Sequence, residues 1–431
     1  MNNRKNILLI VSLSIFLFLL IINTADKTEE EFLDPAGDSK SYLSLAKSIN
    51  EEKTFVRQEF LNQNSVETVR TPGYPIFLSL FSNNKNVVYV QNFFHIISAF
   101  LVYKIIEKRT SNIFAVIFML LYLFNPLLIS LSQLILTETL SIFLINVILF
   151  LLLERDKVVL LSIIISILPL IRPAFLIVVL GFVIFNKIIF KNLEIKKRFL
   201  ILFLIISPSL FWIQRNYELT DQIIFSSITG MNLLEDTASG IMAINEDIRN
   251  NESFLEVVDI RYDEKRYWSQ VLRNEVDLGD ISRVVSNAPG RNPHEVASAY
   301  QSYAIKIIHK YPMETSVLVM RAFLYNTLEP GDQIYNSILN LNKLNFLYYF
   351  MIVINAFLTL LTIFSILKTI KNKEKFAIEI ILYMLMLSPL LLLATPNGRF
   401  GSILFSTAII ICAKYLGNLD LRFVKTSKIT Y

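Results

Sequence analysis

Two charged residues near the start of the chain are of types that catalyse group transfer, and both lie in one polar stretch between apolar segments. Asp38 opens the sequence DSKSYLSLA, and Arg70 opens RTPGYP. A partly desolvated carboxylate at the lip of a helix bundle has a raised pKa that suits a general base. The apolar spacing of Leu43, Ala46 and Ile49 predicts a helix starting at Asp38, so a helix N-cap is the alternative role for this residue.

Arg70 stands before a stiff turn, because two prolines fix φ and Gly73 permits a sharp bend. A guanidinium held by such a loop fits phosphate oxygens in a bidentate geometry. The alternative is an interfacial arginine that reaches towards lipid headgroups. Tyr42 and Tyr74 lie inside the two motifs, and we expect both to contact substrate.

Glu138 is the second candidate catalytic residue. It lies in LTETL, with apolar residues for many positions on either side. A carboxylate inside a membrane costs roughly 2.5 to 3.5 kcal/mol unless it faces a partner or a polar cavity, so it marks a functional site by default. A structural salt bridge is the alternative.

Three further arginines, Arg172, Arg215 and Arg399, fall with Arg70 on the side of the membrane where the topology below disfavours cations. Several guanidinium groups around one phosphate offset its charge in a low-dielectric setting, so all four are candidate donor-phosphate ligands. The alternative is a structural network in which they pair with Asp34, Asp38 and Glu138.

Several function classes are excluded by what the sequence lacks. The three histidines, His95, His294 and His309, show no paired spacing, so a histidine metal site is improbable. The one cysteine, Cys412, allows no intramolecular disulfide. No P-loop, dinucleotide fingerprint, HExxH or nucleophile elbow is present, which argues against a nucleotide-driven pump or a membrane protease. The net charge of +5 reflects Lys and Arg between apolar blocks rather than a nucleic-acid partner.

The elements that must position these residues are transmembrane helices. Hydrophobic residues make up 54% of the chain and charged residues 18%, and the apolar residues form blocks of about twenty, the length that crosses a bilayer. We predict about ten spans, at 7–22, 87–106, 113–130, 138–153, 158–170, 173–190, 199–213, 346–367, 376–393 and 402–415.

The loops between these spans predict the orientation. Lys and Arg cluster in every second short loop and in the C-terminal tail, which places both termini in the cytoplasm and the candidate site outside the cytoplasmic membrane. We expect three regions: a transmembrane catalytic module at 1–214 with an exterior loop at 24–86, an exterior insert at 215–345, and C-terminal helices with a cytoplasmic tail at 346–431. Within the insert, 300–310 and 317–328 are predicted surface helices.

At this point the chain resembles the GT-C superfamily of membrane glycosyltransferases, in particular bacterial relatives of the dolichyl-phosphate-mannose protein mannosyltransferases and of the lipid A aminoarabinose transferase. The resemblance covers most of the chain, and the first exterior loop is its most specific part. The motifs that carry it are DSKSYLSLA from Asp38, RTPGYP from Arg70, Thr137-Glu138, LIRP ending at Pro173, WIQRNY from Trp212, KYP from Lys310, and Arg399-Phe400.

The resemblance implies an all-α polytopic enzyme that moves a hexosyl or pentosyl group from a polyprenyl-phosphate donor to a glycan, lipid or protein acceptor. On that model Asp38 deprotonates an acceptor hydroxyl, the anomeric carbon inverts, and Arg70, Arg215, Arg172 and Arg399 stabilise the departing phosphate.

One departure concerns the acidic pair that family members often have, because Ser39 follows Asp38 here. A paired-acid role, or a divalent metal, would then fall to Glu138 or Asp34. Two other functions stay open: a polymerase or ligase of lipid-linked polysaccharide, and a lipid or sugar transporter or flippase without bond chemistry. A transporter favours ionisable residues at the bilayer midplane, whereas the residues above map to one face.

Overall fold

The computed structural model describes residues 16, 24, 27–34, 37–57, 67–154, 157–190, 193–238, 240–241, 293–329, 345–371, 378–392 and 398–427. The predicted first span, apart from Phe16, and much of the 215–345 insert lie outside these residues, as does most of the turn before Arg399. The predicted all-α class is confirmed for the described residues, whose regular elements are all helical.

The described elements are η1 (Glu30–Phe32), α2 (Asp38–Glu51), α3 (Gly73–Ser79), α4 (Asn84–Glu107), α5 (Asn112–Leu123), α6 (Pro126–Ser132), α7 (Thr137–Leu151), α8 (Val158–Ile171), η3 (Pro173–Phe175), α9 (Leu176–Ile184), α10 (Asn186–Ile189), α11 (Ile195–Thr220), α12 (Ile228–Asn232), η4 (Leu233–Ala238), α18 (Pro293–Lys310), α19 (Pro312–Leu328), α21 (Asn345–Lys371), α22 (Ile378–Leu392) and α23 (Gly398–Ser427).

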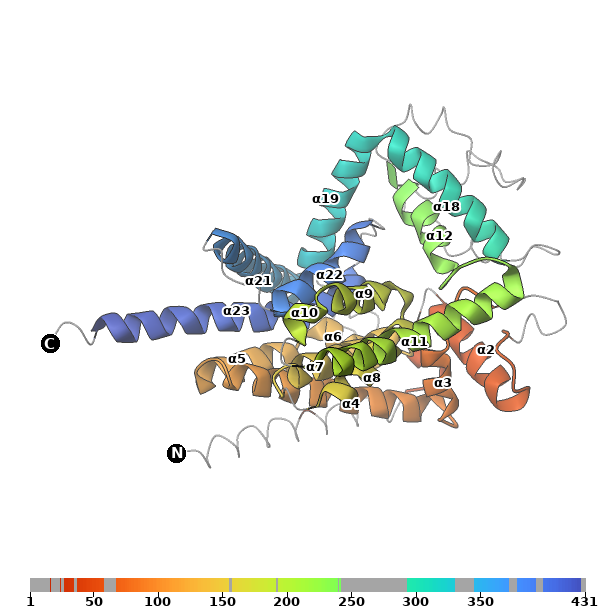
Figure 1. The fold of residues 1–431 in the computed structure, drawn as a ribbon. Helices are drawn as coiled ribbons and strands as arrows, with labels where there is room; N and C mark the ends of the chain where they lie inside the picture. Colours follow the sequence, from red (N-terminus) through yellow and green to blue (C-terminus); the bar gives the residue numbers. More distant parts are fainter. Residues whose placement is uncertain are drawn as a thin grey trace.

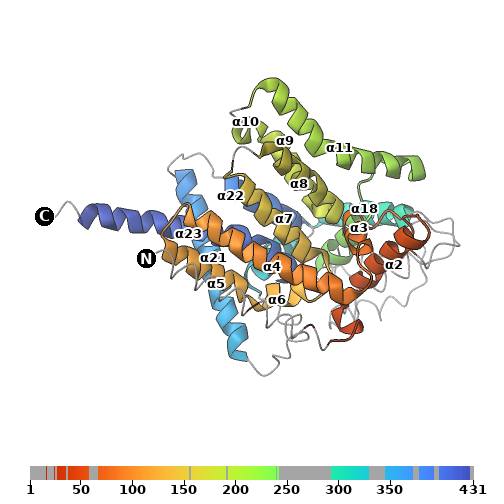
Figure 2. The same ribbon diagram turned by 90° about the horizontal axis from the view of Figure 1, so that it is seen from below.

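A bundle of apolar helices forms the body of the molecule. Helix α4 packs on α5 and α7, α8 packs on α7 and α11, and α23 packs on α21 and α22. Figures 1 and 2 show α4, α5, α7 and α8 side by side, with α2 and α3 at one end of this group. One continuous hydrophobic core joins these helices, and it includes Tyr122, Ile165, Ile205 and Ile409.

The helices have the length and composition of membrane helices. By these criteria three of the described helices, α4, α11 and α21, are fit to cross a bilayer, and the bent pair α5 with α6 makes a fourth if it is one span. Five further apolar helices have 10–17 residues, so the longest covers roughly 25 Å against a hydrocarbon core of about 30 Å. These apolar helices indicate an integral membrane protein. The number of ten spans and the side of the membrane on which each loop lies stay predictions.

The predicted span at 113–130 is not one straight helix. It breaks after Leu123, and the two parts, α5 and α6, are bent by 54°. The break has a local cause, because Asn125 caps α6 through its side chain, which accepts from Leu128 N, and Pro126 occupies the first turn. Proline favours the first turn of a helix and has no N–H to continue the preceding helix.

Four elements form a roof beside the bundle, and we call α12, η4, α18 and α19 the roof. They share a separate core that includes Met231, Tyr300, Ile307 and Leu318. Figure 1 shows α12 and α18 together, with α19 leading back from them towards α22. The helices predicted at 300–310 and 317–328 are present within α18 and α19, and their place on the membrane surface stays a prediction. Helix α19 packs on α21, α22 and α23.

Candidate active site

The first turn of α2 leaves the Asp38 carboxylate available for other partners. Gly37 precedes the helix with φ 84°, a left-handed conformation that glycine adopts without strain. The Asp34 side chain reaches this turn as well, because its Oδ2 accepts from Asp38 N at 3.1 Å. The N-cap alternative for Asp38 is therefore wrong, because Gly37 is the N-cap residue and Asp38 is the first residue of the helix.

Two hydrogen bonds bring this turn to the start of α7. Ser39 Oγ donates to Ile135 O at 2.9 Å, and Ile135 N donates to Phe32 O at 2.9 Å. All three residues are fully buried. Because Ile135 comes just before α7, these bonds place Asp38 near Glu138, which lies in the first turn of that helix.

Three carboxylates and three guanidinium groups meet at this point. Asp38 Oδ1 accepts from Arg70 Nη2 at 2.6 Å, and its Oδ2 accepts from Arg399 Nη2 at 2.9 Å. Glu138 Oε1 accepts from Arg399 Nε at 2.5 Å and lies 3.0 Å from Arg172 Nη1. Asp34 Oδ1 lies 3.7 Å from Arg399 Nη1. The six formal charges sum to zero, which limits the cost of holding them in a low-dielectric setting.

Glu138 is a buried partner of these arginines rather than an exposed acid. Its side chain has 0% exposure, whereas that of Asp38 is 29% exposed. Of these two predicted catalytic residues, only Asp38 lines the cavity described below. The geometry gives Glu138 a positioning role, in which it orients Arg399 and Arg172.

A carboxylate that the sequence analysis did not single out holds the Arg70 loop. Glu67 is 3% exposed, and its Oε1 accepts from Val69 N at 2.7 Å and from Arg70 N at 2.9 Å. Its Oε2 accepts from Arg57 Nε at 2.6 Å. The Arg70 backbone is thus fixed by charge-assisted hydrogen bonds. The Arg70 side chain also donates to Tyr42 Oη at 3.3 Å.

A cavity of about 700 Å³ opens beside the ion pairs, between the bundle and the roof. Its charged wall carries Asp38, Arg70, Arg172 and Arg399, and Tyr42 lies next to them. Much of the remaining wall is apolar and comes from η3, α9, α12, η4, α18, α19, α22 and α23. The apolar lining residues are Val69, Pro173, Ala174, Phe175, Ile177, Ile228, Leu233, Ile308, Val319, Met386, Pro389, Leu390, Leu391 and Ile403.

The expected raised pKa of Asp38 is wrong for this arrangement. Burial works to raise the pKa of the carboxyl, but Arg70 and Arg399 outweigh it, so the pKa of Asp38 lies below its ordinary value. Burial works to lower the pKa of Arg70, but Tyr42 and Asp38 outweigh it and hold that pKa above its ordinary value. Asp38 is therefore a carboxylate whose two oxygens both face cations.

Two predicted site residues lie behind the cavity wall. Tyr74 is fully buried, and its hydroxyl donates to Gln91 Oε1 at 2.8 Å while its ring packs edge-on against Tyr42 at 5.1 Å. Arg215 donates to Glu67 O at 2.7 Å and lies over the Trp212 ring at 4.8 Å. Neither residue lines the cavity. The structure thus brings together Asp38, Tyr42, Arg70, Glu138, Arg172 and Arg399, and leaves these two as their supports.

The carboxylates do not fit the divalent metal that the resemblance left open. Within the described part of the chain, no group of three or more His, Cys, Asp or Glu side chains has an arrangement that could hold a metal ion. Each acid of the cluster already pairs with at least one guanidinium group, and these cations offset the negative charge that a divalent metal would need.

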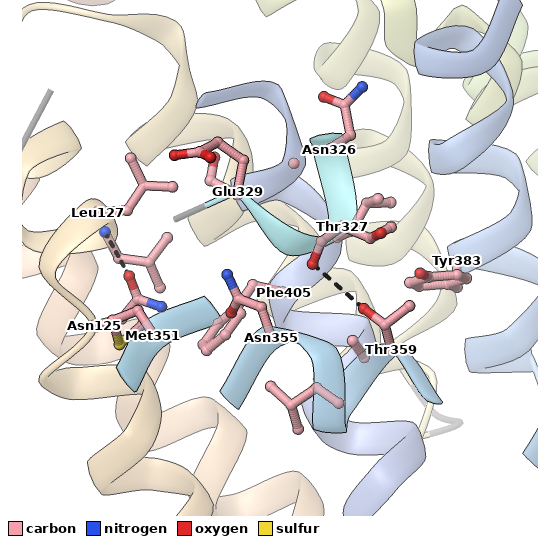
Figure 3. Close-up of a pocket in the computed structure, with 16 residues that line it drawn as sticks. Asn125, Leu127, Asn326, Thr327, Glu329, Met351, Asn355, Thr359, Tyr383 and Phe405 are labelled. Carbon is pink, nitrogen blue, oxygen red and sulfur yellow. Dashed lines mark hydrogen bonds between the residues drawn. The ribbon is translucent and has the colours of Figure 1, made fainter. Parts of the chain in front are cut away.

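A second, much smaller cavity lies among α6, α19, α21, α22 and α23 (Figure 3). Asn125, Asn326 and Asn355 lie around it, and Thr359 Oγ1 donates to Thr327 O at 3.3 Å. Its volume of about 40 Å³ holds on the order of three water molecules, so it is too small for a sugar. The larger cavity is the candidate active site.

Comparison with known proteins yields a likeness of fold. No protein-family model and no curated protein matches the chain. ArnT from Cupriavidus metallidurans in the apo state is similar over 97% of this chain and 78% of that one, with a TM-score of 0.38 and 9% identity. The structure of the same protein bound to undecaprenyl phosphate gives a TM-score of 0.36 and 10% identity over 97% and 79%. At these TM-scores and identities the likeness decides neither the family nor the chemistry, which must follow from this chain's own site.

Proposed function

We propose that the chain transfers a sugar from a polyprenyl-phosphate donor to an acceptor hydroxyl at the exterior face of the membrane. One observation carries the proposal: Asp38 is held between Arg70 and Arg399 at the charged wall of a largely apolar cavity. Such a cavity matches an amphiphile with a phosphate at one end. The predicted topology, with Lys and Arg on the opposite side, supports the exterior assignment.

The charged and the apolar parts of the cavity wall match two different parts of the donor. Arg70, Arg172 and Arg399 lie where a phosphate would bind, and guanidinium groups bind phosphate oxygens in pairs of parallel hydrogen bonds. The apolar lining on α9 and α22, with residues such as Ile177, Met386 and Leu390, suits the first isoprene units of the lipid. Hydrocarbon beyond these units would extend into the bilayer.

The transfer step balances in charge and atoms. Asp38 takes the proton of the acceptor hydroxyl, and the oxygen attacks the anomeric carbon as the bond from that carbon to the phosphate oxygen breaks. Its electron pair stays on the phosphate, which changes from a singly charged diester to a doubly charged monoester. The proton gained by Asp38 offsets this added charge within the site, and a single displacement inverts the anomeric carbon. The arginines contribute most here, because negative charge develops next to them.

Donor binding itself would make Asp38 a stronger base. In the ligand-free protein Arg70 and Arg399 keep the pKa of Asp38 low, and a group with so low a pKa accepts a proton poorly. When a phosphate draws the two guanidinium groups to its own oxygens, Asp38 loses those partners and keeps its burial. Its pKa then rises, so the base becomes competent only when the donor is present.

The direct test is a single-turnover assay with purified protein in detergent. Polyprenyl-phosphate sugars carrying a labelled hexosyl or pentosyl group would be mixed with membrane extract as the source of acceptor. Movement of single labelled sugars to a new product supports the proposal, and the product identifies the acceptor. Transfer of whole lipid-linked glycans would favour a polymerase or ligase. Donor binding without turnover, together with flipping of these lipids in vesicles, would favour a transporter.

A further inference from the structure

One buried hydroxyl on the cavity wall has no hydrogen-bond partner among the residues that the structure describes. Thr71 directly follows Arg70 and lines the cavity, its side chain is 2% exposed, and its Oγ1 is buried and unsatisfied. Nearly all buried polar groups in native proteins are hydrogen-bonded, so an exception calls for an explanation. Because Thr71 lines the cavity, a rotation of its side chain about χ1 would present this hydroxyl to a ligand there, which would provide the missing partner.

A second polar surface lies next to Thr71, on α12. Ser227 N donates to Thr68 O at 2.9 Å, and Ser226 Oγ donates to Val69 O at 2.6 Å, so the start of α12 is tied to the loop that carries Thr71. Thr229 and Asn232 are three residues apart on this helix, which puts them on one face, and both line the cavity. The three side chains offer neutral hydrogen-bond donors and acceptors.

The charges around the cavity limit what can bind there. Asp38 is the one carboxylate among the described lining residues, and each of its oxygens already accepts from an arginine. Once the donor phosphate has drawn these arginines away, Asp38 serves as the base for the acceptor hydroxyl, so a cationic amino sugar would find no second carboxylate among the described residues of this wall. An anionic uronic sugar would compete with the phosphate for the same arginines. The neutral groups on the loop and on α12 fit a sugar that carries only hydroxyls.

We propose that Thr71, Thr229 and Asn232 form a subsite that binds the hydroxyl groups of an uncharged sugar, next to the phosphate at Arg70. The subsite rests on the proposed function, because it supplies the sugar end of the same donor. The subsite lets the protein distinguish the sugar-bearing donor from the sugar-free lipid product. Polyprenyl phosphate without a sugar reaches the arginines but not these three side chains.

The test is equilibrium binding of four probes to purified wild-type protein: polyprenyl phosphate alone, and polyprenyl phosphate carrying glucose, an aminodeoxy sugar or a uronic acid. The same measurements follow with Thr71→Val and Asn232→Leu, which keep the volume and remove the polar atoms. Thr71→Ser keeps the hydroxyl. Thr139→Val is the matched control, because Thr139 is 6% exposed with an unsatisfied hydroxyl but does not line the cavity.

We expect polyprenyl-phosphate glucose to bind more tightly than polyprenyl phosphate alone. Each variant that removes a polar group should reduce this affinity gain about 3- to 10-fold. Thr71→Ser and Thr139→Val should keep the gain, and binding of polyprenyl phosphate should be equal in all variants. The subsite is overturned if an aminodeoxy or uronic sugar binds more tightly than glucose, or if Thr71→Val leaves the gain intact. Failure of polyprenyl phosphate to bind at all would overturn the proposed function as well, which separates the two results.

Discussion

Arg399 donates a hydrogen bond of 2.9 Å from Nη2 to Oδ2 of Asp38, although 361 positions separate the two residues in the sequence. The same guanidinium donates from Nε to Glu138. The site therefore needs α23 as well as the first loop. A catalytic module confined to 1–214 would lack this arginine, so the C-terminal helices take part in the site and do more than anchor the chain.

Replacing Arg70 by lysine should weaken donor binding. Lysine keeps the charge but loses the planar fork that contacts two oxygens at once. With a loss of one hydrogen bond to a charged group, about 1.5 to 3 kcal/mol, KM for a polyprenyl-phosphate donor should rise about 10- to 100-fold. Arg198→Lys is the control, because Arg198 donates to Phe190 O and Leu193 O and does not line the cavity. Equal effects of both variants would contradict a phosphate role for Arg70.

Glu138→Gln should destabilise the fold. Glu138 is fully buried between Arg399 and Arg172, and the amide removes the negative charge that Glu138 supplies to both guanidinium groups. Removing one partner of a buried ion pair costs about 3 to 5 kcal/mol, which thermal unfolding in detergent would register as a lower Tm. Glu154→Gln is the matched control, since the Lys108–Glu154 pair is exposed and should matter little. An unchanged Tm in Glu138→Gln would argue against the positioning role.

The stability of the protein should fall more steeply in acid because of Asp38. Its folded-state pKa lies below the ordinary value, so the stabilisation is fully present above about pH 4, the value of an unfolded Asp, and is lost as the pH falls further. From pH 8 to 5 this residue should contribute no slope. The measurement is Tm against pH for wild type and Asp38→Asn, and the variant should lose less on acidification. Parallel curves below pH 4 would show that Asp38 has no depressed pKa.

Gly401→Ala should disturb the site from a distance. A Cβ at Gly401 would lie 1.8 Å from Asn326 O, a backbone atom of α19, so α19 and α23 would have to separate. Because Arg399 stands two residues earlier on α23, transfer activity and Tm should both fall. Gly181→Ala is the comparison, since its added Cβ meets the end of the Leu385 side chain, which can rotate away. If Gly181→Ala proves the more damaging, the close contact of α19 and α23 is not what holds Arg399 in place.

The sequence predicted the helices and several members of the site for the same reason. Glu138 and Arg399 are charged residues next to long apolar runs, and burial makes such residues costly unless they meet a partner. Asp38 instead stands out as an acid at the start of a helical pattern in a polar stretch between apolar segments. Their convergence could not be predicted, because it depends on how helices far apart in the chain pack. The break of the 113–130 span was readable in the Asn125-Pro126 pair, which is a helix-start signal.

Other parts of the site depend on the direction in which a side chain points, which the spacing of residues in the sequence does not predict. Arg215 and Tyr74 have the right residue types, yet α11 and α3 turn their side chains towards Glu67 O and Gln91. Glu67 was missed because it lies in a polar stretch with no apolar periodicity. The low pKa of Asp38 follows from two arginines at hydrogen-bond distance, which a sequence pattern does not reveal.

The most direct test of the account is sugar transfer by Asp38→Asn, measured together with binding of polyprenyl phosphate. The amide keeps the size of the carboxylate and removes its ability to take a proton, so transfer should fall by about 10² to 10⁴-fold, the range of general-base catalysis, while lipid binding is kept or tightened. Asp221→Asn, at the end of α11 and outside the cavity, should transfer normally. Turnover by Asp38→Asn at the wild-type rate would contradict the account, because no proton acceptor would then be needed at that position.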